Sequence, residues 1–248
     1  MMGLCIYIVE GEMILHYDLV IIGATVTALG IAKTAKASCK TLILNRTEMV
    51  AYEHVYTFKS PGVYSQGAQY YKEFYDLGAD ILLRTEITEI NKDEEGYTLE
   101  IFNNAGFQKV HAKILVDTTT ERETEISEKS LNSILVNRKK SVFPKIEWNN
   151  FLFIDENDEK FNTVIMKYNC DVNLSIYEAR HRLIDLWQQR PKELDGWVIA
   201  AIGFAFEEKP LNRYIKKDEN YYIIPSAYFD TPAASMEAGE ELGRRLTA

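Results

Sequence analysis

The chain has 248 residues, 46% of them hydrophobic and 26% charged, which is the composition of a soluble globular protein with one substantial core. Its formal net charge of −9 argues against a protein that binds nucleic acid or an anionic membrane surface. The three cysteines, Cys5, Cys39 and Cys170, lie far apart, which argues against a disulfide framework or a zinc site and fits a reducing cytoplasm.

The first segment, residues 1–12, is expected to be an appendage. It holds a short apolar run but lacks the basic region and the cleavage site of a signal peptide. No apolar run in the chain approaches the ~20 residues that a membrane-spanning helix needs, so no membrane span is predicted. The fold signal begins near Tyr17.

Residues 18–46 predict a βαβ motif, around which the rest of the chain is organised. Residues 19–22 form a nearly unbroken apolar run, as a strand buried on both faces requires. A glycine follows, then a helical stretch rich in Ala, Leu and Ile over 25–37, and a second apolar run over 41–44. This order of strand, tight turn, helix and strand is typical of a dinucleotide-binding fold.

The turn of this motif has the spacing of a dinucleotide-binding fingerprint. The G-x-G-x-x-G positions hold Gly23, Thr25 and Ala28. A helix that begins here directs free N–H groups and the positive end of its dipole at a pyrophosphate. Thr25 adds a branched side chain where the backbone must approach the phosphates, whereas Ala28 is a mild change. The second strand ends in Asn45, which can hydrogen-bond a ribose but carries no charge.

The middle of the chain predicts a helix followed by a β-meander. Aromatic and apolar residues at 3–4 spacing indicate a helix over 64–77. Strands are expected at 80–91, 97–102 and 107–116, joined by polar turns. A simple Rossmann dehydrogenase would place another helix between these strands. The charged segment 121–128 is expected to be a solvated helix or loop.

The last third predicts a hairpin, a helix and a return to the parallel sheet. Strands at 151–154 and 161–168 are expected around a turn at 155–160, followed by a helix over 175–190 with a capping box between Ser175 and Glu178. A short strand is expected at 221–225. A final helix begins at Pro232, and its Gly239 and Gly243, four residues apart, would allow close packing onto the sheet.

These elements resemble, in the same order, the FAD-dependent oxidoreductases of the glutathione reductase-like (two-Rossmann flavoprotein) superfamily over most of residues 17–248. The first strand and turn resemble the family's V-I-G-x-G-x-x-G segment, and residues 112–120 resemble its strand that ends in A-T-G. Phe229-Asp230 stands where the family has G-D before its last helix. The chain resembles a short member of this superfamily. It also resembles a degenerate one, because Thr25, Thr120 and Phe229 replace glycines.

The resemblance implies an α/β fold: a FAD/NAD(P)-binding Rossmann-like domain with a parallel sheet, a β-meander crossover and a small α+β substrate or cap lobe. It places the first part of the dinucleotide-binding domain at 13–145, the lobe at 146–200 and the return at 201–248. No catalytic acid or base and no metal site emerges. The cofactor contacts that the resemblance implies are Gly23, Thr25, Val26, Thr27, Asn45, Arg46, Thr119, Thr120, Asp230 and Ala233.

Two functions stay open at this point. The first is a FAD-dependent oxidoreductase with an unknown small-molecule substrate, in which the isoalloxazine supplies the redox chemistry and the protein positions it. The second is a degenerate protein that keeps the fold but not the turnover and acts as a binding or structural subunit, so retention of FAD also stays open; the departures at Thr25, Ala28, Asn45 and Thr120 favour this second function. Binding of NAD(P) or a free nucleotide at the same turn is a third option, which the meander disfavours. A cytoplasmic location is expected for each.

Overall fold

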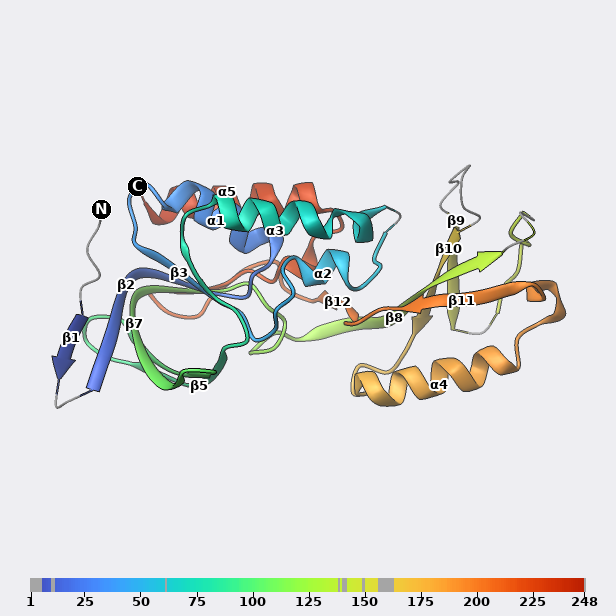
Figure 1. Ribbon diagram of the computed structural model, residues 1–248, viewed down its shortest axis with the longest axis horizontal. Coiled ribbons are helices and arrows are strands. Elements are labelled where there is room, and N and C mark those ends of the chain that lie inside the picture. Colours follow the sequence, from blue (N-terminus) through green and yellow to red (C-terminus); the bar gives the residue numbers. More distant parts are fainter. Residues whose placement is uncertain are drawn as a thin grey trace. The chain divides into compact units, whose positions relative to one another are not determined.

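The computed structural model in Figure 1 describes residues 6–9, 12–60, 62–137, 139, 142–148, 150–155 and 163–247. The chain divides into two compact units. The large unit comprises Met1–Val50, Gln69–Glu123 and Asn212–Ala248, and the small unit comprises Ala51–Ala68 and Thr124–Leu211. The functional boundaries expected after residues 12, 145 and 200 stay a prediction.

The large unit contains, among its described residues, a nine-stranded sheet whose main path runs β13-β14-β7-β2-β3-β4. Each pair from β14 to β4 is parallel, and β13 is antiparallel to β14. The strands β1, β5 and β6 join this path through antiparallel pairs. The strands are β1 (Ile6–Val9), β2 (Glu12–Ile22), β3 (Thr41–Leu44), β4 (Asp80–Leu82), β5 (Glu86–Lys92), β6 (Tyr97–Asn103), β7 (Gly106–Asp117), β13 (Ile215–Lys216) and β14 (Tyr221–Ile223).

The predicted βαβ motif forms at the centre of this sheet. Residues 19–22 of β2 and all four residues of β3 are buried, which explains their continuous apolar pattern. The helix α1 (Val26–Ala35) connects the two strands. Of the segment expected as an N-terminal appendage, Ile6–Val9 pairs with β2 as a hairpin, while residues 1–5, 10 and 11 lie outside the described residues.

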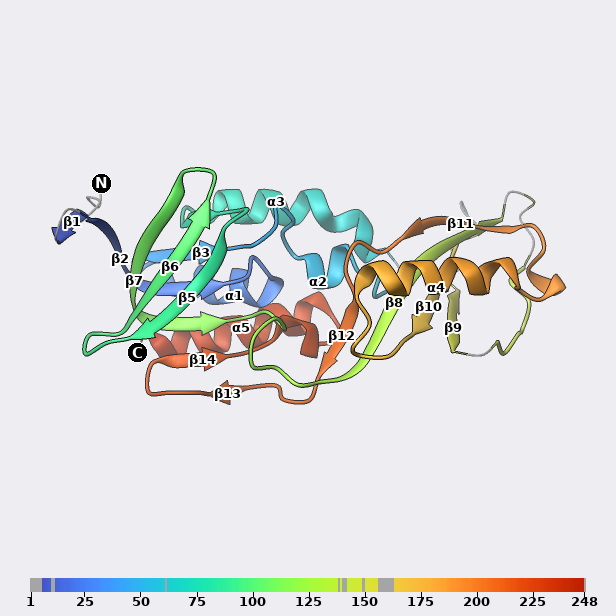
Figure 2. The same ribbon diagram turned by 90° about the horizontal axis from the view of Figure 1, so that it is seen from below.

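Helices cover one face of the large sheet and the meander covers the other (Figures 1 and 2). The helices are α1, α3 (Gly67–Asp76) and α5 (Pro232–Leu246). The meander β5-β6-β7 encloses a core of apolar side chains that includes Val20, Leu99 and Leu115. The parallel sheet and the meander confirm the predicted α/β fold class, because the chain crosses from β4 to β7 by antiparallel strands and not by a helix.

The two helices α1 and α5 touch along their backbones. A Cβ atom at Gly30 would lie 2.3 Å from the carbonyl oxygen of Met236, and one at Gly239 would lie 2.2 Å from that of Thr27. The prediction that Gly239 and Gly243 let α5 approach the sheet is therefore wrong about the partner. These glycines lie against α1, because the sheet face is already covered there by α1 itself.

The small unit contains, within its described part, a five-stranded antiparallel sheet in the order β11-β8-β10-β9, with β12 also paired to β8. The helix α4 (Ile176–Gln188) packs on this sheet through a core that joins Leu183 and Trp187 to Leu131 and Met166. The strands are β8 (Ile126–Asn137), β9 (Phe151–Asp155), β10 (Thr163–Asn169), β11 (Trp197–Ile202) and β12 (Glu207–Pro210). The remaining short helices are α2 (Tyr52–Val55), η1 (Val63–Gln66), η2 (Lys192–Leu194) and, in the large unit, η3 (Ser226–Tyr228).

Local signals in the small unit are partly confirmed. The capping box is present, since Ser175 Oγ accepts from Glu178 N at 3.2 Å and Glu178 Oε2 accepts from Ser175 N at 3.0 Å. The expectation of a helix or loop over 121–128 is wrong at its end, because β8 begins at Ile126 and pairs with β12, although none of these eight residues is buried. The predicted turn at 155–160 lies outside the described residues after Asp155. None of the described helices is long and apolar enough to cross a membrane.

Candidate functional site

The turn after β2 is the feature that the dinucleotide fingerprint predicts. Gly23 has φ +94°, and its N–H donates to Leu44 O at 2.7 Å. A Cβ atom on Gly23 would lie 2.6 Å from Thr119 Cγ2 and 2.9 Å from Thr118 Oγ1. Both the backbone conformation and the lack of space require glycine at this position.

The start of α1 is capped by its own N-terminal residue. Thr25 is the N-cap, and its Oγ1 accepts from Ala28 N at 3.1 Å. The same hydroxyl donates to Thr118 Oγ1 at 2.8 Å, and Thr118 Oγ1 donates to Ile22 O at 2.8 Å. Thr25 therefore stabilises the helix end from the position where the G-x-G-x-x-G fingerprint has its second glycine.

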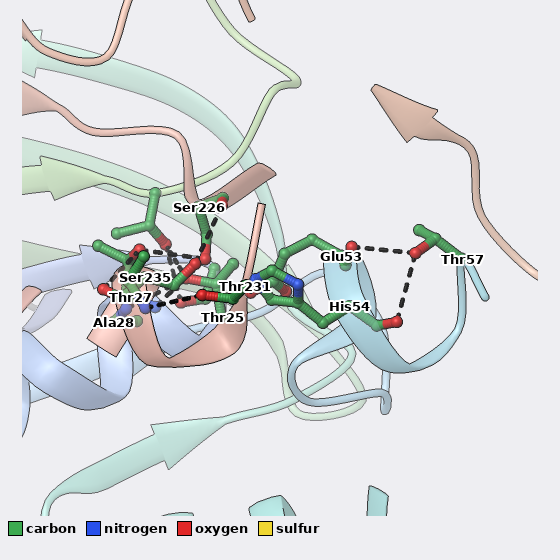
Figure 3. Close-up of polar contacts among 12 residues, drawn as sticks. Thr25, Thr27, Ala28, Glu53, His54, Thr57, Ser226, Thr231 and Ser235 are labelled. Atoms are coloured by element: carbon green, nitrogen blue, oxygen red, sulfur yellow. Dashed lines mark hydrogen bonds and ion pairs between the residues drawn. The ribbon is translucent and has the colours of Figure 1, made fainter. Parts of the chain in front are cut away.

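A second set of hydroxyls joins α1 to the segment that precedes α5. Thr27 N donates to Ser226 Oγ at 3.2 Å, and the Thr27 and Ser226 hydroxyl oxygens lie 3.1 Å apart. Ser235 Oγ donates to Ser226 O at 3.2 Å, and Ser226 N donates to Thr118 O at 2.9 Å. Figure 3 shows these side chains directed toward one another at the N-terminal ends of the two helices.

We call Thr25, Thr27, Thr118, Ser226 and Ser235 the hydroxyl cluster. Each of its members is at most 1% exposed, so the cluster lies in the interior. Its members come from α1, from the end of β7, from η3 and from α5, which the sheet topology brings to one edge. The cluster satisfies backbone groups at the start of α1 with side chains of the protein itself.

Asn45 also supports the turn from within. Its Oδ1 accepts from Ala24 N at 2.9 Å, and its Nδ2 donates to Thr47 O at 2.9 Å and to Met49 O at 3.0 Å. The side chain is buried, so its amide fixes the turn and the loop after β3. The Asn45 side-chain amide, which was expected to hydrogen-bond a ribose, therefore already makes hydrogen bonds within the protein.

The other predicted contacts are dispersed around this edge. Thr119 is buried next to Gly23, and its amide and hydroxyl both donate to Asp117 Oδ1. Arg46 is largely exposed and forms an ion pair with Glu121 at 2.9 Å. The remaining predicted residues are Val26, buried in the first turn of α1, Thr120, half-buried after Thr119, Asp230, exposed before α5, and Ala233, exposed in the first turn of α5.

Sequence reasoning missed several residues of this edge. Thr118, Ser226 and Ser235 were not singled out, although Thr118 directly follows a buried strand in the sequence. Asp117 was also missed as a titratable group. Its side chain is fully buried, and this burial raises its pKa to about 6. A run of small hydroxylated residues at the carboxyl end of a parallel strand was the available signal.

The small unit has its own buried titratable group in α2. Burial, together with the nearby Lys59, lowers the pKa of His54 to about 3, so this side chain is neutral at neutral pH. Thr57 Oγ1 donates to Glu53 O at 3.0 Å, which closes the end of this short helix (Figure 3). Within the described parts of both units, no group of three or more His, Cys, Asp or Glu side chains is arranged to hold a metal ion.

Comparison with known proteins gives structural likeness without sequence likeness. No protein-family profile matches the sequence. No curated protein matches it either. Solved structures do match: p-nitrophenol 4-monooxygenase from Pseudomonas putida aligns with a TM-score of 0.61 at 12% identity, over 92% of this chain and 78% of that one. A geranylgeranyl bacteriochlorophyll reductase-like protein from Thermoplasma acidophilum aligns with a TM-score of 0.62 at 9% identity, over 94% and 78%.

A third match was solved with a cofactor. Aklavinone-11 hydroxylase, in a ternary complex with FAD and aklavinone, aligns with a TM-score of 0.58 at 10% identity, over 94% of this chain and 62% of that one. The chain thus spans less than two thirds of the length of this hydroxylase. Together these matches show that the chain has the Rossmann-type fold found in flavoproteins.

Proposed function

We propose that this chain is a degenerate relative of FAD-dependent oxidoreductases that acts as a binding or structural protein without flavin turnover. The proposal rests on the hydrogen bonds that three backbone amides of the turn already donate to side chains. The N–H groups of Ala24, Thr27 and Ala28 donate to side chains of the large unit at 2.9, 3.2 and 3.1 Å. A helix N-terminus binds a pyrophosphate through amides that are free to donate.

The energetics of this arrangement support the proposal. To seat a phosphate, the hydrogen bonds from these amides to Asn45, Ser226 and Thr25 would have to break. Each acceptor left without a partner in the interior would cost about 1–3 kcal/mol. The Thr25 side chain also fills the space beside the turn, with its Cγ2 3.2 Å from the position of a Cβ on Gly23. The residues present therefore do not fit the pyrophosphate of FAD in this arrangement.

The second candidate is a FAD-dependent oxidoreductase of the glutathione reductase-like superfamily with a small-molecule substrate. It is favoured by the fold, which aklavinone-11 hydroxylase shares in its complex with FAD, and by Gly23, whose φ of +94° forms the tight turn after β2. In this candidate FAD would supply the redox chemistry. The contact residues would be Gly23, Thr25, Val26, Thr27, Asn45, Arg46, Thr119, Thr120, Asp230 and Ala233.

For either candidate we propose a cytoplasmic protein that does not bind nucleic acid. The net charge of −9 supports the absence of nucleic-acid binding, because a nucleic-acid interface needs a positive surface. The partner of a binding or structural protein would then be another protein, whose identity the fold alone does not specify.

The absorption spectrum of the purified full chain tests the proposal. We expect a protein without near-ultraviolet and blue flavin bands after incubation with FAD and gel filtration. Flavin bands at one FAD per chain would overturn the proposal and favour the oxidoreductase. The variant Thr25→Gly tests whether the Thr25 side chain is what prevents FAD from binding at the turn, with Thr88→Gly on the exposed side of β5 as its control. Flavin colour gained in Thr25→Gly and not in the control would show that the Thr25 side chain prevents binding.

A further inference from the structure

Asp117 is a buried carboxyl group whose ionisation the proposed function does not use. It ends β7 in register with Ile22 of β2 and Ile223 of β14. Its Oδ1 accepts from Thr119 N at 2.8 Å and from Thr119 Oγ1 at 2.7 Å, whereas its Oδ2 has no hydrogen-bond partner among the described residues. An ionised carboxylate with one unsatisfied oxygen is far more costly in the interior than a neutral carboxyl.

The surroundings of Asp117 favour its neutral form. Burial is the largest cause that raises its pKa to about 6; the hydrogen bonds from Thr119 and the charge of Arg122 act against it, and the charge of Glu121 adds to it. From β14, the pKa of the Tyr221 hydroxyl is raised first by burial and then by the charge of the Asp117 carboxylate. The neighbour in register on β2 is the apolar Ile22.

Asp117 is linked to the Gly23 turn through the two residues that follow it. Thr119 Cγ2 and Thr118 Oγ1 lie 2.6 and 2.9 Å from the position of a Cβ on Gly23, so these residues form a wall of the turn. Thr118 also accepts the hydroxyl of Thr25. The hydrogen bonds to Asp117 Oδ1 hold Thr119 in this wall.

We propose that Asp117 is a proton-linked latch: neutral Asp117 keeps Thr118 and Thr119 closed against the Gly23 turn, and ionised Asp117 favours an open form in which its carboxylate reaches water. Opening exposes the unsatisfied oxygen to solvent and removes the wall from Gly23. The inference concerns the same turn as the proposed function, but it rests on the Asp117 contacts and does not require that FAD be absent.

Amide hydrogen exchange of the full chain tests the latch. After correction for the intrinsic rate, the protection of the Thr119 amide in the wild type should fall about tenfold between about pH 5 and about pH 7.5, because the carboxyl pKa moves from about 6 in the closed form to 3.8 in the open form. Asp117→Asn cannot ionise and should show no such fall. The control Asp76→Asn, at an exposed position of α3, should behave as the wild type.

Constant protection in the wild type, or a tenfold fall that persists in Asp117→Asn, would overturn the latch. If Asp117→Asn does not fold, the variant Thr119→Val tests the latch in its place. It removes a hydrogen bond that lowers the pKa of Asp117, so the midpoint of the protection change should move to higher pH. An unchanged midpoint would contradict the proposal. FAD binding by the wild type would overturn the proposed function without changing any of these outcomes.

Discussion

Ser226 illustrates how single hydroxyls close the turn. Its Oγ accepts from Thr27 N, its amide donates to Thr118 O, and its carbonyl accepts from Ser235 Oγ. One fully buried residue thus connects α1, the end of β7 and α5. At the residue scale, the protein provides from its own side chains the acceptors that the helix N-terminus needs.

Ser226→Ala tests this connection. The substitution removes the acceptor of the Thr27 amide in the interior, so the free energy of unfolding should fall by about 1–3 kcal/mol in urea denaturation. Ser38→Ala, at an exposed position after α1, serves as the control and should change stability by less than about 0.5 kcal/mol. Equal effects of the two substitutions would show that the Ser226 contacts do not stabilise the fold.

Asp117→Asn tests the cost of the buried carboxyl group. The folded pKa of about 6 lies above the ordinary value of 3.8, so the contribution of Asp117 to stability is fully present below pH 3.8 and is lost as the pH rises to about 6. Above this window the ionised group costs about 2–3 kcal/mol. Urea denaturation should therefore find the variant more stable than the wild type by that amount near neutral pH, with the difference shrinking toward about pH 4. A difference that does not vary with pH would contradict this account.

At the element scale, the backbone contact between α1 and α5 sets how the two helix N-termini meet. Gly239→Ala would place a Cβ 2.2 Å from Thr27 O, a backbone atom that cannot move independently of α1. Circular-dichroism melting should show a loss of about 1–3 kcal/mol or more from overpacking. The control Glu241→Ala, on the exposed side of α5, should melt close to the wild type. A wild-type melting curve for Gly239→Ala would mean that the helices are not in contact there.

The small unit offers an independent test at the same scale. Glu207 Oε2 accepts from Lys167 Nζ at 2.6 Å and from Asn132 Nδ2 at 2.7 Å, and both charged side chains are less than 20% exposed. Glu207→Gln should cost about 1–3 kcal/mol, because it leaves Lys167 as a poorly solvated charge. Glu128→Gln breaks the exposed pair with Lys209 and should cost less than about 1 kcal/mol in the same thermal melts. Similar losses for both variants would contradict a buried role for the Glu207 cluster.

Local patterns predicted the elements better than they predicted the site. The buried strands of the βαβ motif, the meander and the capping box of α4 depend on neighbours in sequence, so their patterns can be read directly. The hydroxyl cluster depends on contacts between residues far apart: Thr27 meets Ser226 across 199 positions. The sequence did indicate that Thr25 and Asn45 depart from the fingerprint, but their new partners became visible only in the folded chain.

At the scale of the whole molecule, the architecture and the chemistry are separable. The chain has the Rossmann-type fold found in flavoproteins, while the Ala24, Thr27 and Ala28 amides of its glycine turn donate to internal side chains. Dinucleotide binding therefore depends on the residues at the turn and not on the fold alone.

The most direct test of this account is a fluorescence titration of FAD with the full-length wild-type protein. Because the Ala24, Thr27 and Ala28 amides already have acceptors, we predict that flavin fluorescence shows no saturable change as protein is added. A saturable change with one FAD bound per chain would contradict the account and would show that the hydroxyl cluster yields to a pyrophosphate.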